Sequence, residues 1–186
     1  MNDVFGDVAG PNITLAQSGI GTWSEINFRS LMRSNQRPDG SHLYSSFHKG
    51  LEWMSDPDLT AIVAYLRSLP SVDNEVERRD VGFLGRNTTG FFTSVAGVMG
   101  YVPQVSPSFR AEYGEYLTTS VAGCDRCHSR PGGIFSSDVP MAGGREVSFD
   151  NETKVAPNIT QSKENGIGNW SEEDLRVYLR SGKTPA

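Results

Sequence analysis

Two cysteines and a histidine stand close together in the second half of this chain. Two residues separate Cys124 from Cys127, and His128 follows directly. Two thiols one helical turn apart can form thioether bonds with the vinyl groups of a haem, and an adjacent histidine can ligate its iron. The pattern Cys-x-x-Cys-His is typical of covalent haem attachment. Since the chain has only 2 cysteines, and both fall in this pattern, we expect one covalently bound haem c.

Three other roles for these cysteines have to be considered. A redox-active disulfide would be preceded by a thioredoxin-like strand, whereas a tyrosine-rich helix is expected before Cys124. A zinc site would need two more ligands, and the other histidines, His42 and His48, are more widely spaced than is usual for zinc. The third alternative is a plain buried pair of cysteines. All three are less consistent with the full motif than haem attachment is.

The composition is that of a soluble globular protein. Of the 186 residues, 37% are hydrophobic, and the formal net charge is −5. Acidic and basic residues are mixed, so no basic stripe suggests nucleic acid or an anionic membrane as a partner. Residues 1–7 lack the basic start and apolar core of a secretory signal, and residues 91–102 are too short and too rich in small residues to span a membrane. We expect membrane association only through partners or missing segments.

The sequence contains an internal repeat. Pro11-Asn12-Ile13-Thr14 and the block Gly-Ile-Gly-x-Trp-Ser-Glu at 19–25 return at 157–160 and 166–172, and Trp23 and Trp170 lie 147 residues apart. In each copy a serine, Ser24 or Ser171, is placed to cap a short amphipathic helix. The two copies should therefore share one local structure.

Two further helices are expected. Residues 56–69 follow the N-cap candidate Ser55, carry an apolar stripe and end at Pro70. Residues 108–121 carry aromatic residues on one side and lead into the cysteines. Residues 71–107 mix charges with glycine and proline and are typical of a long connector. The expected fold class is all-α, with long irregular loops.

The chain resembles the cytochrome c subunits of membrane-associated bacterial dehydrogenases, such as the alcohol and gluconate dehydrogenase complexes. The resemblance covers nearly the whole chain apart from the connector. It rests on the haem motif and the residues Gly-Glu-Tyr-Leu before it, and on Ala142-Gly143-Gly144-Arg145, the two repeat blocks, Asp39-Gly40-Ser41-His42-Leu43-Tyr44 and Ala64-Tyr65-Leu66-Arg67-Ser68-Leu69-Pro70. It implies a periplasmic string of haem modules that passes electrons from a dehydrogenase catalytic subunit to quinone or another acceptor.

The resemblance also implies roles for individual residues. Cys124 and Cys127 would form the thioethers, and His128 would be the proximal iron ligand. Gly114 and Tyr116 would lie where the first helix of the module crosses the last. The Asn-Ile-Thr and Trp-Ser blocks would line the haem edge, although turn formation and helix capping explain each of these residues equally well.

The distal ligand departs from the family pattern. Family modules place a methionine shortly after His-Leu-Tyr, but Phe47 or His48 stands at that position here. Met54 is the nearest alternative, although a methionine beside a helix cap is more often a packing residue. Met141 lies too close after His128 to be a good candidate. His48 and Met54 therefore remain as distal candidates.

The repeat predicts two incomplete modules. A haem motif matching Cys124 would fall before Met1. Residues 1–75 are therefore expected to be the C-terminal part of a first module without its haem motif, residues 76–107 a linker, and residues 108–186 the N-terminal part of a second module. We hypothesise that the helices at 56–69 and 108–121, each lacking its own partner, pack on each other and turn residues 42–54 toward the haem.

The favoured function is electron transfer, because no nucleophile and base can be identified from a motif. A haem-dependent, peroxidase-like module is the enzymatic alternative, in which His42, Phe47 and His48 would line an open distal site. A haem-free interaction fragment is the third possibility.

Overall fold

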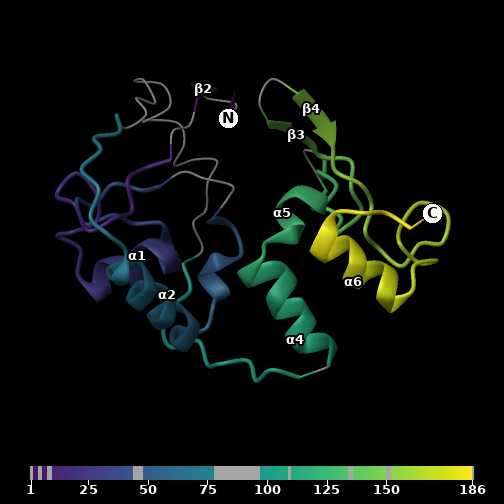
Figure 1. Cartoon of the computed structure of the whole chain (residues 1–186), viewed down its shortest axis with the longest axis horizontal. Coiled ribbons are helices and arrows are strands. Elements are labelled where there is room, and N and C mark those ends of the chain that lie inside the picture. The colour runs from purple at the N-terminus through teal and green to yellow at the C-terminus, as the bar shows by residue number, and fades with distance from the viewer. Residues whose placement is uncertain are drawn as a thin grey trace. The chain divides into compact units, whose positions relative to one another are not determined.

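The computed structural model describes residues 2–3, 6–7, 10–43, 48–77, 97–108, 110–133, 136–149 and 152–185. The chain forms two compact units, Met1–Gly123 and Cys124–Ala186 (Figure 1). The described residues are mostly helix and irregular loop, so the expected all-α class is confirmed. The strands are short and form two antiparallel pairs, β1 (Asn2–Asp3) with β2 (Gly6–Asp7) and β3 (Glu146–Phe149) with β4 (Glu152–Val155).

The described residues of the first unit form three α-helices and two shorter turns of helix. These are α1 (Glu25–Ser34), the 3₁₀ turn η2 (Leu51–Trp53), α2 (Asp56–Ser68), α4 (Ala111–Tyr116) and the π-helical turn η3 (Leu117–Val121). The expected helices at 24 onward, 56–69 and 108–121 are all present. The helix before the cysteines begins later than expected, at Ala111.

The starts of α1 and α2 follow from their caps. Ser24 and Asn27 form a capping box, in which Ser24 Oγ accepts the Asn27 N–H at 3.3 Å and Asn27 Oδ1 accepts the Ser24 N–H at 2.9 Å. Ser55 Oγ accepts the Asp58 N–H at 3.2 Å, and Pro57 lies in the first turn of α2. These side chains satisfy backbone donors that have no partner inside the helix.

The apolar stripe of α2 packs against α1 and the loop before it. Leu59 and Val63 are 1% and 4% exposed, and Val63 forms a core cluster with Ile20 and Phe28. The hypothesis that this stripe packs on the helix at 108–121 is therefore wrong for Val63 and Leu66, which pack against α1 and the loop before it. Contact between those two helices does exist, but it is polar and lies at the N-terminal end of α2, where Tyr116 binds Ser55.

The helix before the cysteines changes from α-helical to π-helical winding after Tyr116. The Ala122 N–H donates to the Leu117 carbonyl at 2.7 Å, while the hydroxyls of Thr118 and Thr119 bond to the carbonyls of Gly114 and Glu115. Threonine hydroxyls that bond back to the preceding turn are known to bend and weaken helices. These bonds explain why the regular α-helical winding stops at Tyr116.

The described part of the connector lies along the first unit. The Val98 N–H donates to the Arg33 carbonyl at 3.1 Å, and Val102 exchanges two hydrogen bonds with Asp56 through backbone and carboxylate. Residues 97–102 are thereby fixed to the ends of α1 and α2. Residues 78–96 of the expected connector lie outside the described residues.

The second unit begins with α5 (Cys124–His128), continues through the β3–β4 hairpin and ends with α6 (Glu172–Ser181). Ser171 and Asp174 form the same capping box as Ser24 and Asn27, and Gly182 ends the helix with φ 70°. In the part of the chain that the structure describes, no helix combines the length and apolarity needed to cross a membrane.

Candidate haem-attachment site

Both cysteines and the histidine lie on the short helix α5. It follows Gly123, whose φ of 63° ends the preceding π-turn. Cys124 and Cys127 are half-buried and carry free thiols. Because residues three and four apart share one side of a helix, Cys127 and His128 face the same side as Cys124. The structure thus brings together the three residues that the sequence singled out for attachment.

The ring of His128 is oriented by one hydrogen bond. Its Nδ1 lies 2.8 Å from the carbonyl oxygen of Pro157. A carbonyl only accepts, so Nδ1 carries the proton and donates it. In the neutral ring this leaves the lone pair on Nε2, which is the form that ligates a metal.

Backbone hydrogen bonds from the glycine pair at 143–144 fix the position of the Pro157 carbonyl. The Gly143 N–H donates to the His128 carbonyl, and the Gly144 N–H donates to the Ala156 carbonyl at 2.8 Å. Gly143 has φ 70°, and a Cβ at this position would lie 2.4 Å from the Asn158 nitrogen. Only glycine allows this approach. In the sequence, Gly143 and Gly144 stand out only as residues shared with the family, and no local pattern indicates this role.

Unsatisfied polar atoms lie on the residues around α5. Asp125 Oδ1 and Arg145 Nε are buried without a hydrogen-bond partner among the described residues, although Arg145 Nη2 lies 3.3 Å from Asp138 Oδ2. The Arg145 side chain as a whole is 34% exposed, and a guanidinium with an unmet donor is suited to a further anionic oxygen.

The donor set fits a haem c. Two free thiols stand one turn apart, an imidazole keeps Nε2 available, and Arg145 retains an unmet donor. These match the vinyl groups, the iron and a carboxylate of the haem, respectively. In the described part of the chain, no three histidine, cysteine or carboxylate side chains group so as to hold a metal ion, so the extra ligands of a zinc site are not found there.

The distal candidates belong to the first unit. Met54 is 3% exposed, and its N–H donates to the Leu51 carbonyl at 3.0 Å, as expected for a packing residue beside a helix cap. His48 is half-buried, whereas the exposed His42 pairs its backbone with Gln36. Phe47 lies outside the described residues, and the distal ligand stays a prediction.

The two repeat copies form the same loop. Asn12 and Asn158 each accept the N–H two residues on, from Thr14 at 3.0 Å and Thr160 at 2.8 Å. In both copies the tryptophan N–H then donates to the isoleucine carbonyl three residues back. The asparagine oxygens therefore form turns, which supports the simpler of the two explanations for these blocks.

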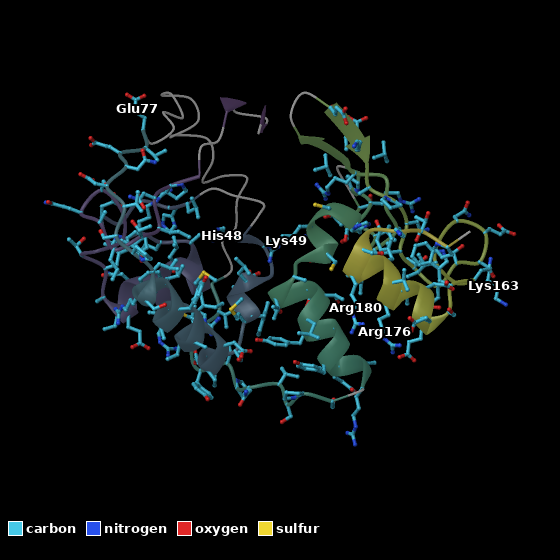
Figure 2. All side chains as sticks on the ribbon, viewed as in Figure 1. His48, Lys49, Glu77, Lys163, Arg176 and Arg180 are labelled. Atoms are coloured by element: carbon cyan, nitrogen blue, oxygen red, sulfur yellow. The ribbon has the colours of Figure 1, made fainter. Side chains whose placement is uncertain are left out.

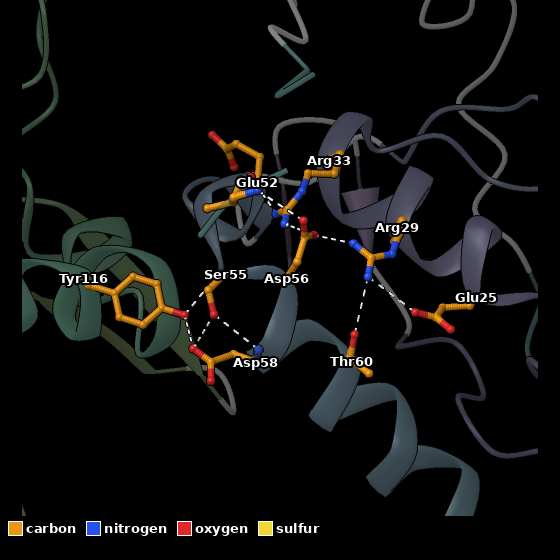
Figure 3. Close-up of polar contacts among 10 residues, drawn as sticks. Glu25, Arg29, Arg33, Glu52, Ser55, Asp56, Asp58, Thr60 and Tyr116 are labelled. Carbon is orange, nitrogen blue, oxygen red and sulfur yellow. Dashed lines mark hydrogen bonds and ion pairs between the residues drawn. The ribbon is translucent and has the colours of Figure 1, made fainter. Parts of the chain in front are cut away.

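A polar network surrounds the N-terminal end of α2 (Figure 3). The Tyr116 hydroxyl donates to Asp58 and accepts the Ser55 N–H at 3.1 Å. Burial raises the pKa of Tyr116, and the hydrogen bond to Asp58 raises it further. On the other side of the helix start, Arg33 Nη2 lies 2.7 Å from Asp56 Oδ1, and Arg29 contacts the same oxygen.

This network favours the charged form of Asp56. Burial raises its pKa, but hydrogen bonds from Arg33 and the Val102 N–H, together with the charges of both arginines, outweigh burial and lower the pKa below 3.8.

The expectation for Tyr116, that it lies at a crossing of two helices, is met in part, since Tyr116 contacts α2. At Gly114, a Cβ would meet nothing within 4 Å among the described residues, so no described helix crosses there and the expectation for Gly114 stays a prediction. The close approach occurs at Gly50, where a Cβ would lie 2.5 Å from the Thr119 carbonyl oxygen.

Comparison with known proteins extends the resemblance. No protein-family model matches the chain. A fructose dehydrogenase cytochrome subunit of Gluconobacter japonicus is 28% identical over 97% of the chain, and a dihaem cytochrome c-type protein of Cereibacter sphaeroides is 30% identical over 97%. The cytochrome c subunit of a quinone alcohol dehydrogenase of Gluconobacter oxydans is 24% identical over 96%.

The chain is similar over nearly its whole length to cytochrome c subunits of dehydrogenases. The similarity to these cytochromes runs through both units and is not limited to the haem motif. The chain spans 38%, 61% and 40% of the lengths of the three relatives described above. The activities and partners of the complete relatives therefore support only a proposal about this chain.

Proposed function

We propose that this chain is an electron-transfer part of a bacterial dehydrogenase complex and carries one covalent haem c. The observation that supports this most is the geometry of α5, where two free thiols and an oriented imidazole share one side of a helix. Homology to cytochrome subunits of dehydrogenases supports the same function.

Each residue of the site has a defined task in this proposal. Cys124 and Cys127 hold the haem through thioether bonds, and His128 is the proximal ligand through Nε2. The Pro157 carbonyl fixes the ring and increases the basicity of the ligating nitrogen. Arg145 binds a haem carboxylate with its unmet donor. The haem, when bound, supplies the one-electron redox chemistry.

The distal ligand is proposed to be His48 or Met54 of this chain. The two would give different potentials, because a thioether favours ferrous iron relative to a second imidazole. The module assignment of the sequence analysis, with boundaries at 1–75, 76–107 and 108–186, also stays a proposal. In the structure, the boundary between the two units falls between Gly123 and Cys124.

The partners follow from the relatives. Their names place them as cytochrome subunits of fructose, alcohol and gluconate dehydrogenases. We therefore infer that this chain receives electrons from a dehydrogenase catalytic subunit and passes them to quinone or another acceptor. We also infer a periplasmic location, where haem attachment of this kind takes place.

A redox titration tests the function. The chain is produced with periplasmic haem-maturation machinery, and its visible spectrum is followed as the potential is changed. We expect a reversible one-electron transition and no appreciable peroxide turnover. The variant His128→Ala should shift or abolish the transition, whereas His42→Ala, which alters an exposed histidine, should leave it unchanged.

Two results would contradict the proposal. Rapid peroxide turnover that depends on His42 or His48 would indicate the peroxidase-like module. A product without any redox-active absorbance, in a host that matures a control cytochrome c, would indicate the haem-free interaction fragment.

A further inference from the structure

The helices α1 and α6 match position by position. Corresponding residues lie 147 apart, and the shared pattern includes the capping box, a basic pair four residues apart and a serine that bonds back to the previous turn. The basic pair is Arg29 and Arg33 in α1 and Arg176 and Arg180 in α6. The two helices therefore offer the same polar groups in the same register.

In the first unit, this pattern binds the start of another helix. Arg29 and Arg33 both contact the carboxylate of Asp56, which is the first residue of α2 and is 4% exposed. Beside this ion pair, Phe28 packs against Val63 in the core cluster. The arginine pair of α1 thus recognises an acidic helix N-terminus, and the apolar positions beside it accept the stripe of that helix.

The loop before α1 binds the tail that follows α2. Asn12 Nδ2 donates to the Val72 carbonyl at 2.8 Å, and the Thr14 hydroxyl accepts the Val72 N–H at 3.1 Å. The Ser18 hydroxyl donates to Asp73 at 2.6 Å. Together, α1 and its loop hold the whole segment from Ser55 to Asn74.

In the second unit, the corresponding arginines and apolar residues of α6 do not bind a second helix in this way. Arg180 has no hydrogen-bond or ion-pair partner among the described residues, and Arg176 pairs only with the exposed Glu172 and Glu173 of its own helix. Both arginines project from α6 in Figure 2. Leu179 is 80% exposed, and Leu175, the counterpart of the buried Phe28, is only half-buried.

The loop of the second copy is open as well. Asn158 keeps its turn with Thr160, but its side-chain nitrogen has no partner in the described parts of the chain. Its counterpart, Asn12, uses that nitrogen to hold Val72. The basic pair, the apolar residues and the asparagine amide of the second unit therefore all lack the group that their first-unit counterparts bind.

We propose that α6 and the Asn158 loop form an interaction surface for a helix–tail segment with the chemistry of residues 55–74. The occupant has a serine cap, an aspartate in the first turn, an apolar stripe at helical spacing and an extended tail. Charge complementarity selects it, because two arginines on one face of α6 match one carboxylate at a helix start. This inference is independent of haem binding.

A labelled peptide tests the surface. A synthetic peptide with the sequence of residues 54–75 and blocked ends is titrated into the full ¹⁵N-labelled chain. We expect saturable binding, with amide shift changes at Leu179, Arg180 and Asn158. Changing the peptide's aspartate, Asp56→Asn, should weaken binding about tenfold, as expected for a charge-assisted pair at a partly buried site.

Matched variants of the chain define the partner of that aspartate. Arg180→Gln should weaken binding of the unchanged peptide by a similar factor, but should not weaken the Asp56→Asn peptide further, because the two changes remove the same contact. Lys154→Gln, which removes an exposed charge from β4, should have no effect. Leu179→Glu should weaken binding of both peptides.

Three results would overturn the proposal. The first is the absence of saturable binding. The second is equal sensitivity to Lys154→Gln and Arg180→Gln, which would indicate non-specific attraction to positive charge. The third is shift changes confined to α1, which would show that the peptide replaces α2 in the first unit and does not occupy α6.

Discussion

The Pro157 carbonyl determines which ring nitrogen of His128 carries the proton: Nδ1 donates to it, and Nε2 keeps its lone pair. A donor bond from Nδ1 fixes both the tautomer and the plane of the ring. Ala156, the residue before Pro157, accepts the Gly144 N–H, and the Gly143 N–H donates to the His128 carbonyl. A change at Gly143 would therefore act on the ligand through the backbone, without touching either cysteine.

Tyr116 is the other residue with a decisive polar contact. Its hydroxyl satisfies the Ser55 N–H and donates to Asp58, and the residue is buried. Tyr116→Phe leaves both groups without this partner, so we expect the free energy of unfolding to fall by about 1–3 kcal/mol. Urea unfolding at neutral pH measures this loss.

Tyr113→Phe is the matched control for this prediction. Tyr113 stacks on Tyr116 with ring centroids 6.4 Å apart and lies on the same helix. Its hydroxyl makes no hydrogen bond among the described residues, so its removal should change stability by less than about 0.5 kcal/mol. Equal losses for the two variants would mean that the Tyr116 hydroxyl has no special role.

At the scale of elements, the buried carboxylate of Asp56 joins α2 to two arginines of α1, Arg29 and Arg33. Asp56→Asn leaves Arg33, which is 8% exposed, without its anion. Breaking a buried pair in this way costs about 3–5 kcal/mol. We expect a loss of that order at pH 7, measured by urea unfolding.

The pH dependence of this loss has a defined sign. The pKa of Asp56 in the folded chain lies below 3.8, so its contribution to stability is complete above pH 3.8 and disappears as the pH falls through the lowered pKa. The difference between the wild-type chain and Asp56→Asn should therefore shrink in acid. Glu25→Gln, which removes an exposed partner of Arg29, should cost less than about 1 kcal/mol. A difference that stays constant down to strongly acidic pH would contradict this assignment.

The helices could be predicted because their signals are local. The caps Ser24, Ser55 and Ser171 stand beside their helices in the sequence, and the structure begins each helix at the residue that follows. The π-turn after Tyr116 was not predicted, because two threonine hydroxyls compete there with the helix's own bonds. The β3–β4 hairpin was also not predicted, because its short, charged strands lack a clear alternating pattern.

At the scale of the whole molecule, the sequence predicted that the motif residues share one short helix, but it did not predict the contacts that surround them. The motif Cys124–His128 is contiguous, so its placement on one helix follows from spacing alone. The bond from His128 to Pro157 joins residues 29 apart in sequence, and no local pattern encodes it. The contact of Val63 with Phe28 joins residues 35 apart in sequence, and no local pattern encodes it either.

The repeat links the two units through shared local structure. Each unit carries the same loop, capping box and arginine pair, although only the second carries the cysteines. Both cysteines of the chain fall in the one Cys-x-x-Cys-His motif, and the central proposal is that a haem is covalently bound there.

Intact and peptide mass spectrometry of the chain made with haem-maturation machinery tests this claim most directly. We predict that the intact chain gains the mass of one haem, that the added mass maps to the peptide containing Cys124 and Cys127, and that the double variant Cys124→Ala, Cys127→Ala does not gain it. An unmodified chain, produced beside a fully matured control cytochrome c, would contradict the account.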